Sequence, residues 1–191
     1  MNVECLKWIE DARKALGEFD TSQLDGVVKV CAASLKSGGT LFFCGNGGSA
    51  ADSMHLSAEL VGRFLSDREP MRAVALTADN AAITAIANDF GYEGIFARQL
   101  SALARAGDTL IAISTSGRSP SILAAVAAAR KLGLSVVAMT GAGGSDLADA
   151  ADASVVVPAS VSGHVQEVLL AAGHRSEEHT SELQSRSTIS Y

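Results

Sequence analysis

Short apolar segments alternate with helical patterns over most of this 191-residue chain. The segments expected to form strands are residues 40–44, 73–77, 109–114, 135–140 and 153–157. Between most of them, apolar residues recur at the spacing of an amphipathic helix. Neighbouring parallel strands need such crossover helices, which then cover both faces of the sheet. The alternation therefore predicts an α/β fold, a three-layer α/β/α sandwich around a five-stranded parallel sheet.

Two further helical patterns precede the first expected strand. Apolar residues recur at roughly helical spacing over residues 6–19 and again over residues 24–35, before a Gly-Gly pair ends the second pattern. We therefore expect two N-terminal helices within residues 1–38. A chain of this length has enough material for one domain with its own core, which we assign to residues 1–174.

Charge and cysteine content narrow the functional class. The formal net charge of −6 offers no basic surface to a nucleic acid, so any anion site must be local. Cys5, Cys31 and Cys44 form neither a CxxC pair nor a metal-like cluster, which favours a reducing cytoplasm over a disulfide framework. The first residues lack the pattern of a secretion signal, and no apolar stretch has the length of a membrane span. We expect a cytoplasmic protein without nucleic-acid or membrane partners.

The last residues differ in composition from the rest of the chain. Residues 165–172 begin a regular helical pattern, but from Arg175 onward the sequence is polar, rich in serine and without apolar periodicity. Residues 175–185 also match the translation of a common sequencing-adapter oligonucleotide. We therefore expect the last helix to be cut short near Arg175, and we interpret residues 175–191 as an artefact outside the domain.

The first expected strand leads directly into a glycine-rich loop, residues 45–50, with the sequence Gly-Asn-Gly-Gly-Ser-Ala. Small residues let the backbone approach an anion, and a helix start presents unpaired N–H groups. The letters also satisfy the dinucleotide pattern G-x-G-x-x-A, which expects an acidic residue at the end of the second strand. Asp67 and Glu69 have the required spacing but lie in a charged, proline-ended loop, and Asp79 is too distant. We interpret the loop as a cradle for a sugar or phosphate, with a simple tight turn as the alternative.

A second loop, Ser114–Pro120, carries four hydroxyl groups between a strand and a helix. Ser119 is suited to the N-cap and Pro120 to the first helical position, so hydroxyls and free N–H groups converge there. No lysine follows the glycine as in a Walker loop, which favours a phosphate monoester over a nucleoside triphosphate. Helix capping for stability alone is the other interpretation. Both loops follow parallel strands, at the sheet edge where such folds bind ligands.

Two pairs of residues offer chemistry on helices. His55 and Glu59 are four residues apart, so they share a face of the helix after the first loop. Gln166 and His174, eight residues apart, share a face of the last helix. A surface ion pair is the ordinary role of such residues, although imidazole and carboxylate groups can also exchange protons or bind zinc. Their spacing matches no recognised zinc signature.

Several separated motifs occur together and in a fixed order. They are Cys44-Gly-Asn-Gly-Gly-Ser49, Met54-His55, Glu59-Leu60, Ala87-Asn-Asp-Phe-Gly91, Ile113-Ser-Thr-Ser-Gly117 with Ser119, Met139-Thr-Gly141, and Val165-Gln-Glu167 with His174. Over residues 1–174, the chain thereby resembles the phosphoheptose isomerases of the sugar isomerase (SIS) superfamily, whose fold is flavodoxin-like. The resemblance implies conversion of sedoheptulose 7-phosphate to D-glycero-D-manno-heptose 7-phosphate, a precursor of lipopolysaccharide or surface glycans.

The resemblance also implies roles for individual residues. The sugar would contact Asn46, Gly47, Gly48, Ser49, Glu59, Asn88, Asp89 and Gln166, and its phosphate would contact Ser114, Thr115, Ser116 and Ser119. Glu59 and His174 would be the acid–base pair, which suits a reaction that moves hydrogen between C1 and C2. In several relatives, the positions matching His55, Glu59, Gln166 and His174 hold zinc, so one zinc ion per subunit is expected. Family members are typically homotetramers with shared active sites, and residues 1–38 would belong to the oligomer core.

Two other classes of SIS protein are alternatives. Adaptor relatives that associate with a replication initiator resemble this chain in fold and loops but lack the acid–base pair. Glu59 and His174 therefore favour the enzyme over the adaptor. A sugar-phosphate-sensing regulator is the third hypothesis, and the sequence offers no DNA-binding segment to support it.

Overall fold

Five parallel strands form the centre of the fold in the computed structural model, which describes residues 3–65 and 67–188. The strands are β1 (Leu41–Cys44), β2 (Ala73–Ala75), β3 (Thr109–Ser114), β4 (Ser135–Gly141) and β5 (Ala153–Val157). They pair in the order β2-β1-β3-β4-β5, and every pairing is parallel. The predicted sheet is confirmed, although β2 is shorter than the apolar segment that predicted it.

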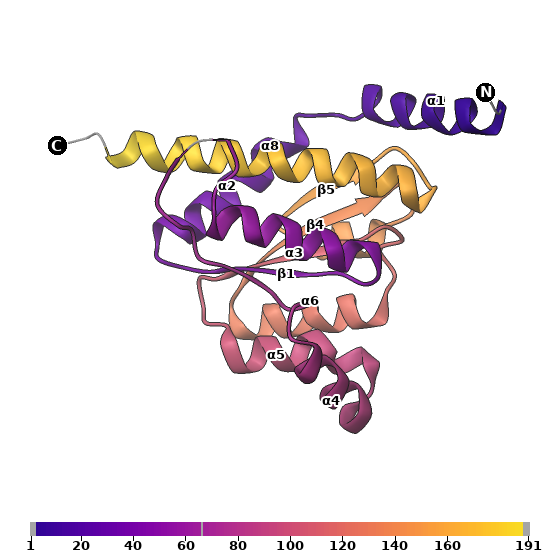
Figure 1. The fold of residues 1–191 in the computed structure, drawn as a ribbon. Coiled ribbons are helices and arrows are strands. Elements are labelled where there is room, and N and C mark those ends of the chain that lie inside the picture. Colours follow the sequence, from indigo (N-terminus) through magenta and orange to yellow (C-terminus); the bar gives the residue numbers. More distant parts are fainter. Residues whose placement is uncertain (1–2, 66, 189–191) are drawn as a thin grey trace.

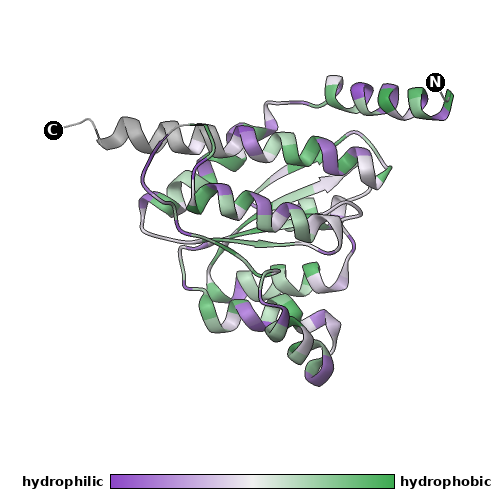
Figure 2. Cartoon of the chain, in the orientation of Figure 1, coloured by the Kyte–Doolittle hydropathy of each residue, from purple (hydrophilic) through white to green (hydrophobic). Residues whose placement is uncertain are grey.

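Helices cover both faces of this sheet (Figure 1). One face carries α2 (Gln23–Lys36), α3 (Gly48–Val61) and α8 (Ser162–Thr188), and the other carries α4 (Asn80–Phe90), η1 (Tyr92–Gly94), α5 (Ile95–Leu103), α6 (Pro120–Leu132) and α7 (Ser145–Asp149). The predicted α/β/α sandwich is therefore confirmed. These helices carry both hydrophobic and hydrophilic residues, as expected for elements between a sheet and solvent (Figure 2).

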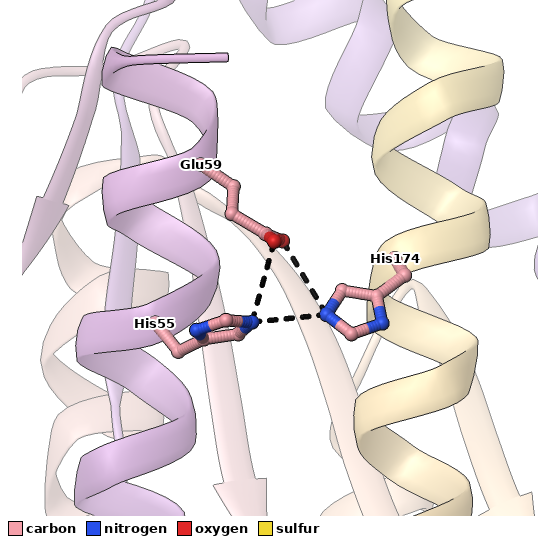
Figure 3. A group of neighbouring side chains, drawn as sticks. All are labelled: His55, Glu59 and His174. Carbon is pink, nitrogen blue, oxygen red and sulfur yellow. Dashed lines mark hydrogen bonds and ion pairs between the residues drawn. The ribbon is translucent and has the colours of Figure 1, made fainter. Parts of the chain in front are cut away.

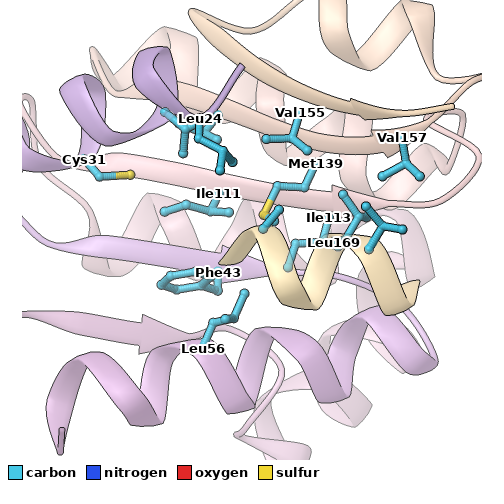
Figure 4. Packing of buried hydrophobic residues seen from close by; sticks show 14 of the residues in the cluster. Leu24, Cys31, Phe43, Leu56, Ile111, Ile113, Met139, Val155, Val157 and Leu169 are labelled. Atoms are coloured by element: carbon cyan, nitrogen blue, oxygen red, sulfur yellow. The ribbon is translucent and has the colours of Figure 1, made fainter. Parts of the chain in front are cut away.

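Alternate strand residues supply two separate cores. Phe43 and Ile111 belong to the cluster under α2, α3 and α8 (Figure 4), while Phe42 and Leu110 belong to the cluster under α5 and α6. Side chains alternate between the faces of a strand, so a sheet covered on both sides needs apolar residues at every position. This explains why every residue of β1 and β3 is buried.

The first helix, α1 (Val3–Gly17), projects from this body (Figure 1). Two residues anchor it: Ala15 is buried in the core, and the Trp8 ring centroid lies 4.1 Å from that of His164 at the start of α8. Another side of α1 leaves apolar side chains in contact with solvent, with Ile9 59% exposed. The two predicted N-terminal helices are present, and the first has an apolar face that this single chain does not cover.

The last helix differs from the expectation. α8 continues to Thr188 instead of ending near Arg175. The reason is that residues 174–188 contain no glycine or proline and include good helix formers, so local propensity extends the helix without an apolar stripe. The Ser176 hydroxyl donates to the Ala172 carbonyl at 2.8 Å, and the Thr180 hydroxyl donates to the Ser176 carbonyl at 2.7 Å.

Those two hydroxyl-bearing residues lie over the core. Thr180 is only 2% exposed, and with Ser176 and Gly173 it lines a cavity of about 40 Å³ next to Phe43 and Leu56. A small polar side chain fills less of a core site than a large apolar one, which accounts for the void. The assignment of residues 175–191 to an artefact stays a prediction. Among the described residues, no helix is both long and apolar enough to cross a membrane.

Candidate functional site

The two predicted anion loops lie next to each other. They follow β1 and β3, which are neighbours in the sheet with Cys44 opposite Ala112. Parallel strands end at the same edge, so both loops open on the same side of the fold. The Asn46 side chain joins them directly, because its amide nitrogen donates to the Ser119 hydroxyl at 2.8 Å.

Two positions of the first loop require glycine, each for a different geometric reason. Gly47 has a φ of 57°, in the left-handed region that glycine tolerates, and it directly precedes α3. At Gly48, a Cβ atom would collide with the side-chain amide of Gln166 on α8. Ser49 is buried, and its N–H donates to the Asn46 carbonyl at 3.0 Å. The loop thus permits the close approach of α3 and α8, and its predicted role as a cradle for a sugar or phosphate stays a prediction.

Hydroxyls of the second loop partly hold their own turn. The Ser114 hydroxyl accepts from the Gly117 N–H at 3.1 Å, and the Ser116 hydroxyl accepts from the Arg118 N–H at 3.3 Å. The Thr115 hydroxyl donates to that of Ser162 at 3.3 Å. These bonds turn the segment sharply between β3 and α6. The Ser114 and Ser116 hydroxyls accept in them, so their own hydrogens can still be donated to an anion.

Ser119 is the residue before α6, as predicted, and Pro120 is the first residue of that helix. However, the Ser119 side chain makes no capping hydrogen bond. Its hydroxyl instead meets the amide of Asn46 and lies 3.2 Å from the hydroxyl of Ser121. The first N–H groups of α6 therefore lack a side-chain cap, which suits an anion at the helix start.

His55, Glu59 and His174 meet in one cluster (Figure 3). The Nε2 atoms of the two histidines are 3.0 Å apart. One carboxylate oxygen of Glu59 lies 3.3 Å from His55 Nε2, and the other lies 3.5 Å from His174 Nε2. Because α3 and α8 pack side by side, residues 119 positions apart in the sequence face each other here.

The surroundings of the cluster restrict its movement. The Phe64 ring stacks on His174 with a centroid distance of 4.9 Å and an interplanar angle of 13°. Arg68 donates to the Glu59 carbonyl at 3.0 Å and to the Leu60 carbonyl at 2.9 Å, which ties the following loop to the end of α3. One oxygen of Glu59 is buried and accepts no hydrogen bond. A buried carboxylate oxygen without a donor favours a proton or a cation as its partner.

The cluster also fits a metal ion by its donor atoms. One ligand atom from each of His55, Glu59 and His174 lies within 4.8 Å of the others. Two imidazole nitrogens and a carboxylate oxygen are ligands that zinc accepts. The described residues therefore include a His/Glu group able to hold a divalent cation.

Gln166 lies near the start of α8, beside the start of α3, whereas the His/Glu cluster lies further toward the C-terminal part of both helices. Its amide nitrogen donates to an Asp52 carboxylate oxygen at 3.5 Å, next to Gly48. Asp52 precedes His55 by three residues, roughly one 5.4 Å turn of α3. Burial raises the pKa of the Asp52 carboxyl, and the hydrogen bond from Gln166 and the nearby His55 offset this only in part. A role for Gln166 as a ligand or sugar contact stays a prediction.

Asn88 and Asp89 lie at the end of α4 with exposed side chains. The Asn88 amide donates to the Asp89 carboxylate at 2.7 Å. The same chain segment then forms η1, where the Tyr92 hydroxyl donates to the Asn46 side-chain oxygen at 2.8 Å. This contact connects the segment of Asn88 and Asp89 to the first loop, and sugar binding by the two residues stays a prediction.

Four residues of this site were not anticipated: Asp52, Phe64, Tyr92 and Ser121. Asp52 could have been found, because it lies three residues before His55 on the same side of a predicted helix. Ser121 follows Ser119 by two residues but carried no separate signal. Phe64 and Tyr92 lie in segments without periodicity, so only the tertiary structure brings them to the site.

Comparison with known proteins gives a consistent result. The SIS domain family matches residues 7–141. The phosphoheptose isomerase of Akkermansia muciniphila is 45% identical over 166 residues, which cover 87% of this chain and 87% of that protein. The phosphoheptose isomerase of Mycobacterium bovis is 50% identical over 147 residues, covering 77% of this chain and 75% of that protein.

Solved structures agree with the sequence comparison. A phosphoheptose isomerase from Francisella tularensis superposes with a TM-score of 0.89 at 31% identity, covering 94% of this chain and 97% of that chain. The enzyme from Neisseria gonorrhoeae superposes with a TM-score of 0.80 at 35% identity, covering 94% of each chain. The resemblance inferred from the separated motifs is confirmed.

Proposed function

The chain belongs to the phosphoheptose isomerases of the SIS domain family, and from this membership we propose how its residues carry out the reaction. It is an isomerase that interconverts sedoheptulose 7-phosphate and D-glycero-D-manno-heptose 7-phosphate. The observation that carries the proposal is the Glu59 carboxylate held between His55 and His174. The adaptor alternative is not favoured, because the relatives over most of the chain are isomerases and the acid–base pair is present.

Glu59 and His174 divide the proton transfers between them. An aldose–ketose isomerisation removes a proton from carbon and returns it to the neighbouring carbon, while a second proton moves between the two oxygens. Glu59 acts as the base toward carbon, since its carboxylate is largely buried with one oxygen free of hydrogen bonds. His174 moves the proton between the oxygens, with its ring held by Phe64.

The phosphate binds at the turn of Ser114, Thr115, Ser116 and Ser119, where hydroxyls and the first N–H groups of α6 converge. Glu59 lies eleven residues after Gly48 on α3, about 16 Å along the helix axis. The anion loops flank the start of that helix. The phosphate and the reacting carbons of the sugar therefore bind at different levels of α3, and Asn46, Asn88, Asp89 and Gln166 are the proposed contacts of the sugar hydroxyls.

The metal proposed for the cluster is zinc, one ion per subunit. His55, Glu59 and His174 would hold it, and Gln166 is the proposed fourth ligand. When bound, zinc would polarise the substrate carbonyl as a Lewis acid. The approach of two imidazole nitrogens and a carboxylate oxygen to within 4.8 Å of one another supports this assignment.

A homotetramer is the proposed assembly, with active sites shared between subunits. The exposed apolar side of α1 supports an oligomer, since such a face is costly to leave in water. The three cysteines are free thiols, and burial raises the pKa of both Cys31 and Cys44 to about 12. Free thiols are typical of the reducing cytoplasm, which is the proposed location.

The test is an assay of aldose formation from sedoheptulose 7-phosphate, with and without added zinc. Glu59→Gln keeps the shape of the side chain but removes the base, so kcat/KM should fall by at least about 10²-fold. The matched control is Asp149→Asn, an exposed carboxylate at the end of α7, away from α1 and from the His/Glu cluster. Undiminished turnover by Glu59→Gln would remove Glu59 from its role, and equal turnover without zinc would contradict the metal assignment.

A further inference from the structure

We propose that Tyr92 is a positioning residue that, through Asn46, keeps Ser119 oriented as a hydrogen-bond donor toward the substrate phosphate. The inference rests on the proposed function, because it assumes that the anion at this turn is the phosphate of the sugar. Tyr92 belongs to η1 and lies more than half exposed beside the first loop. The proposal adds Tyr92 to the phosphate site, although Tyr92 lies 27 positions before Ser119 in the chain.

The hydrogen bonds around Asn46 have a defined direction. The Tyr92 hydroxyl donates to Asn46 Oδ1 at 2.8 Å. Asn46 Nδ2 donates to the Ser119 hydroxyl at 2.8 Å and to the Ser121 hydroxyl at 2.9 Å. An amide group has one oxygen and two N–H donors, so both hydrogens are used and the oxygen is paired. Asn46 therefore acts as a bridge between the loops.

The hydrogens available to Asn46, Ser119 and Ser121 indicate whether the Ser119 hydroxyl donates to or accepts from the phosphate. Ser121 is 1% exposed, and its hydroxyl lies 3.2 Å from that of Ser119. The buried Ser121 hydroxyl accepts from Asn46, and Ser119 is the other hydrogen-bonding group described beside it, so we infer that Ser121 donates its own hydrogen to Ser119. With hydrogens from Asn46 and Ser121, both lone pairs of the Ser119 oxygen are filled. The Ser119 hydrogen then points to a further acceptor, and a phosphate oxygen is a strong one.

Tyr92 sets the direction of this chain of hydrogen bonds. A phenol is a stronger acid than a serine hydroxyl, so it preferentially donates, and the amide oxygen of Asn46 faces it. If the phenol hydroxyl is removed, the amide can turn over and present its oxygen to the serines. Ser119 would then donate to Asn46 instead of to the phosphate. Tyr92 thus affects phosphate binding without touching the atoms that react.

The test is Tyr92→Phe, which keeps the ring and removes only the hydroxyl. The Kd for inorganic phosphate, measured by calorimetry, and the KM for sedoheptulose 7-phosphate should each rise roughly three- to tenfold, the value of one hydrogen bond. The kcat should stay unchanged, because Glu59 and His174 are untouched. The matched control is Ser101→Ala, whose hydroxyl donates to the Ala97 carbonyl of its own helix at 3.0 Å; it should change neither constant.

A double variant separates positioning from general structural damage. In a Ser119→Ala background, Tyr92→Phe should have no further effect on phosphate affinity. An unchanged Kd for Tyr92→Phe alone, or an equal loss with and without Ser119, overturns the inference. Phosphate binding by the unaltered protein without turnover of the sugar contradicts the proposed function but leaves this test valid. Absence of phosphate binding by the unaltered protein overturns both.

Discussion

At the scale of single residues, the site depends on side chains that restrict one another. Glu59 has an imidazole beside each of its carboxylate oxygens, and His174 has Phe64 stacked on its ring. Preorganised groups of this kind need little rearrangement when charge develops during a reaction. We therefore expect the neighbours of the proposed acid–base pair to contribute to catalysis by holding its geometry, and a substitution of Phe64 can measure this contribution.

Phe64→Ala should lower kcat by roughly three- to tenfold, because an aromatic contact of this kind is worth about 0.5–1.5 kcal/mol. The KM should change little, since Phe64 is not among the proposed sugar or phosphate contacts. Steady-state kinetics of the isomerisation provide the measurement. Phe64→Tyr is the matched variant and should retain activity because it keeps the stacked ring. A similar loss in both variants would show that stacking is not the cause.

At the scale of elements, one carboxylate joins three segments on the far side of the sheet from α1. An Asp152 oxygen accepts from the Arg130 guanidinium of α6 at 2.6 Å and from the Val136 N–H of β4 at 2.7 Å. The same guanidinium donates to the Ala150 carbonyl at 2.7 Å. Although burial raises the pKa of Asp152, these bonds and the charge of Arg130 outweigh it, and the pKa is lowered.

This lowered pKa predicts a pH-dependent contribution to stability. A carboxyl with a lower pKa in the folded state stabilises the fold above its unfolded pKa of about 3.9, and that stability is lost as the pH falls through the folded value. Asp152→Asn should therefore lower Tm at pH 7 by about 1 to 4 °C, a small effect because the pair is partly exposed.

The difference in Tm between Asp152→Asn and the unaltered protein should shrink below about pH 4 and disappear once the carboxyl is protonated. Thermal melts between pH 3 and pH 7 are the measurement. The control is Asp67→Asn, an exposed carboxylate in the loop after α3. A difference that grows toward acid pH would contradict the assigned sign.

At the scale of the whole molecule, one side of α1 exposes apolar side chains that no other part of the described chain covers. Its exposed apolar residues include Val3 at 78%, Leu6 at 48% and Ile9 at 59% exposure. They recur at intervals of three residues and so lie along neighbouring positions of one helix side. Burial of such a side against other subunits would supply the association energy of the proposed tetramer.

Ile9→Asp should weaken that assembly, because it places a charge in the proposed interface. Light scattering coupled to size-exclusion chromatography should report a shift from tetramer to smaller species at equal protein concentration. The matched control is Ser101→Asp, which makes the same change from a neutral to a negative side chain at an exposed position on α5, on the other face of the sheet. An identical mass for the two variants, equal to that of the unaltered protein, would exclude this face from the interface.

The local sequence by itself determined the alternation of strands and helices, the two N-terminal helices and the positions of both loops. It also determined that His55 and Glu59 share a helix face, since i and i+4 positions follow from the helix period alone. The separated motifs, from the first loop to His174, were sufficient to predict the family. The helices, strands and loops depend on residues close together in the chain, whose relative positions are set by backbone geometry, whereas the family was predicted from the order of the motifs along the chain.

Only the tertiary structure decided which distant residues meet. His55 and His174 are 119 positions apart, and their contact requires α3 and α8 to pack side by side on the sheet. Tyr92 contacts Asn46 because the chain returns to the first loop after α4. No periodicity in the sequence predicts this return. The length of α8 was predicted wrongly for a related reason: apolar periodicity reports how a helix packs, whereas propensity without breakers lets it continue beyond its packed part.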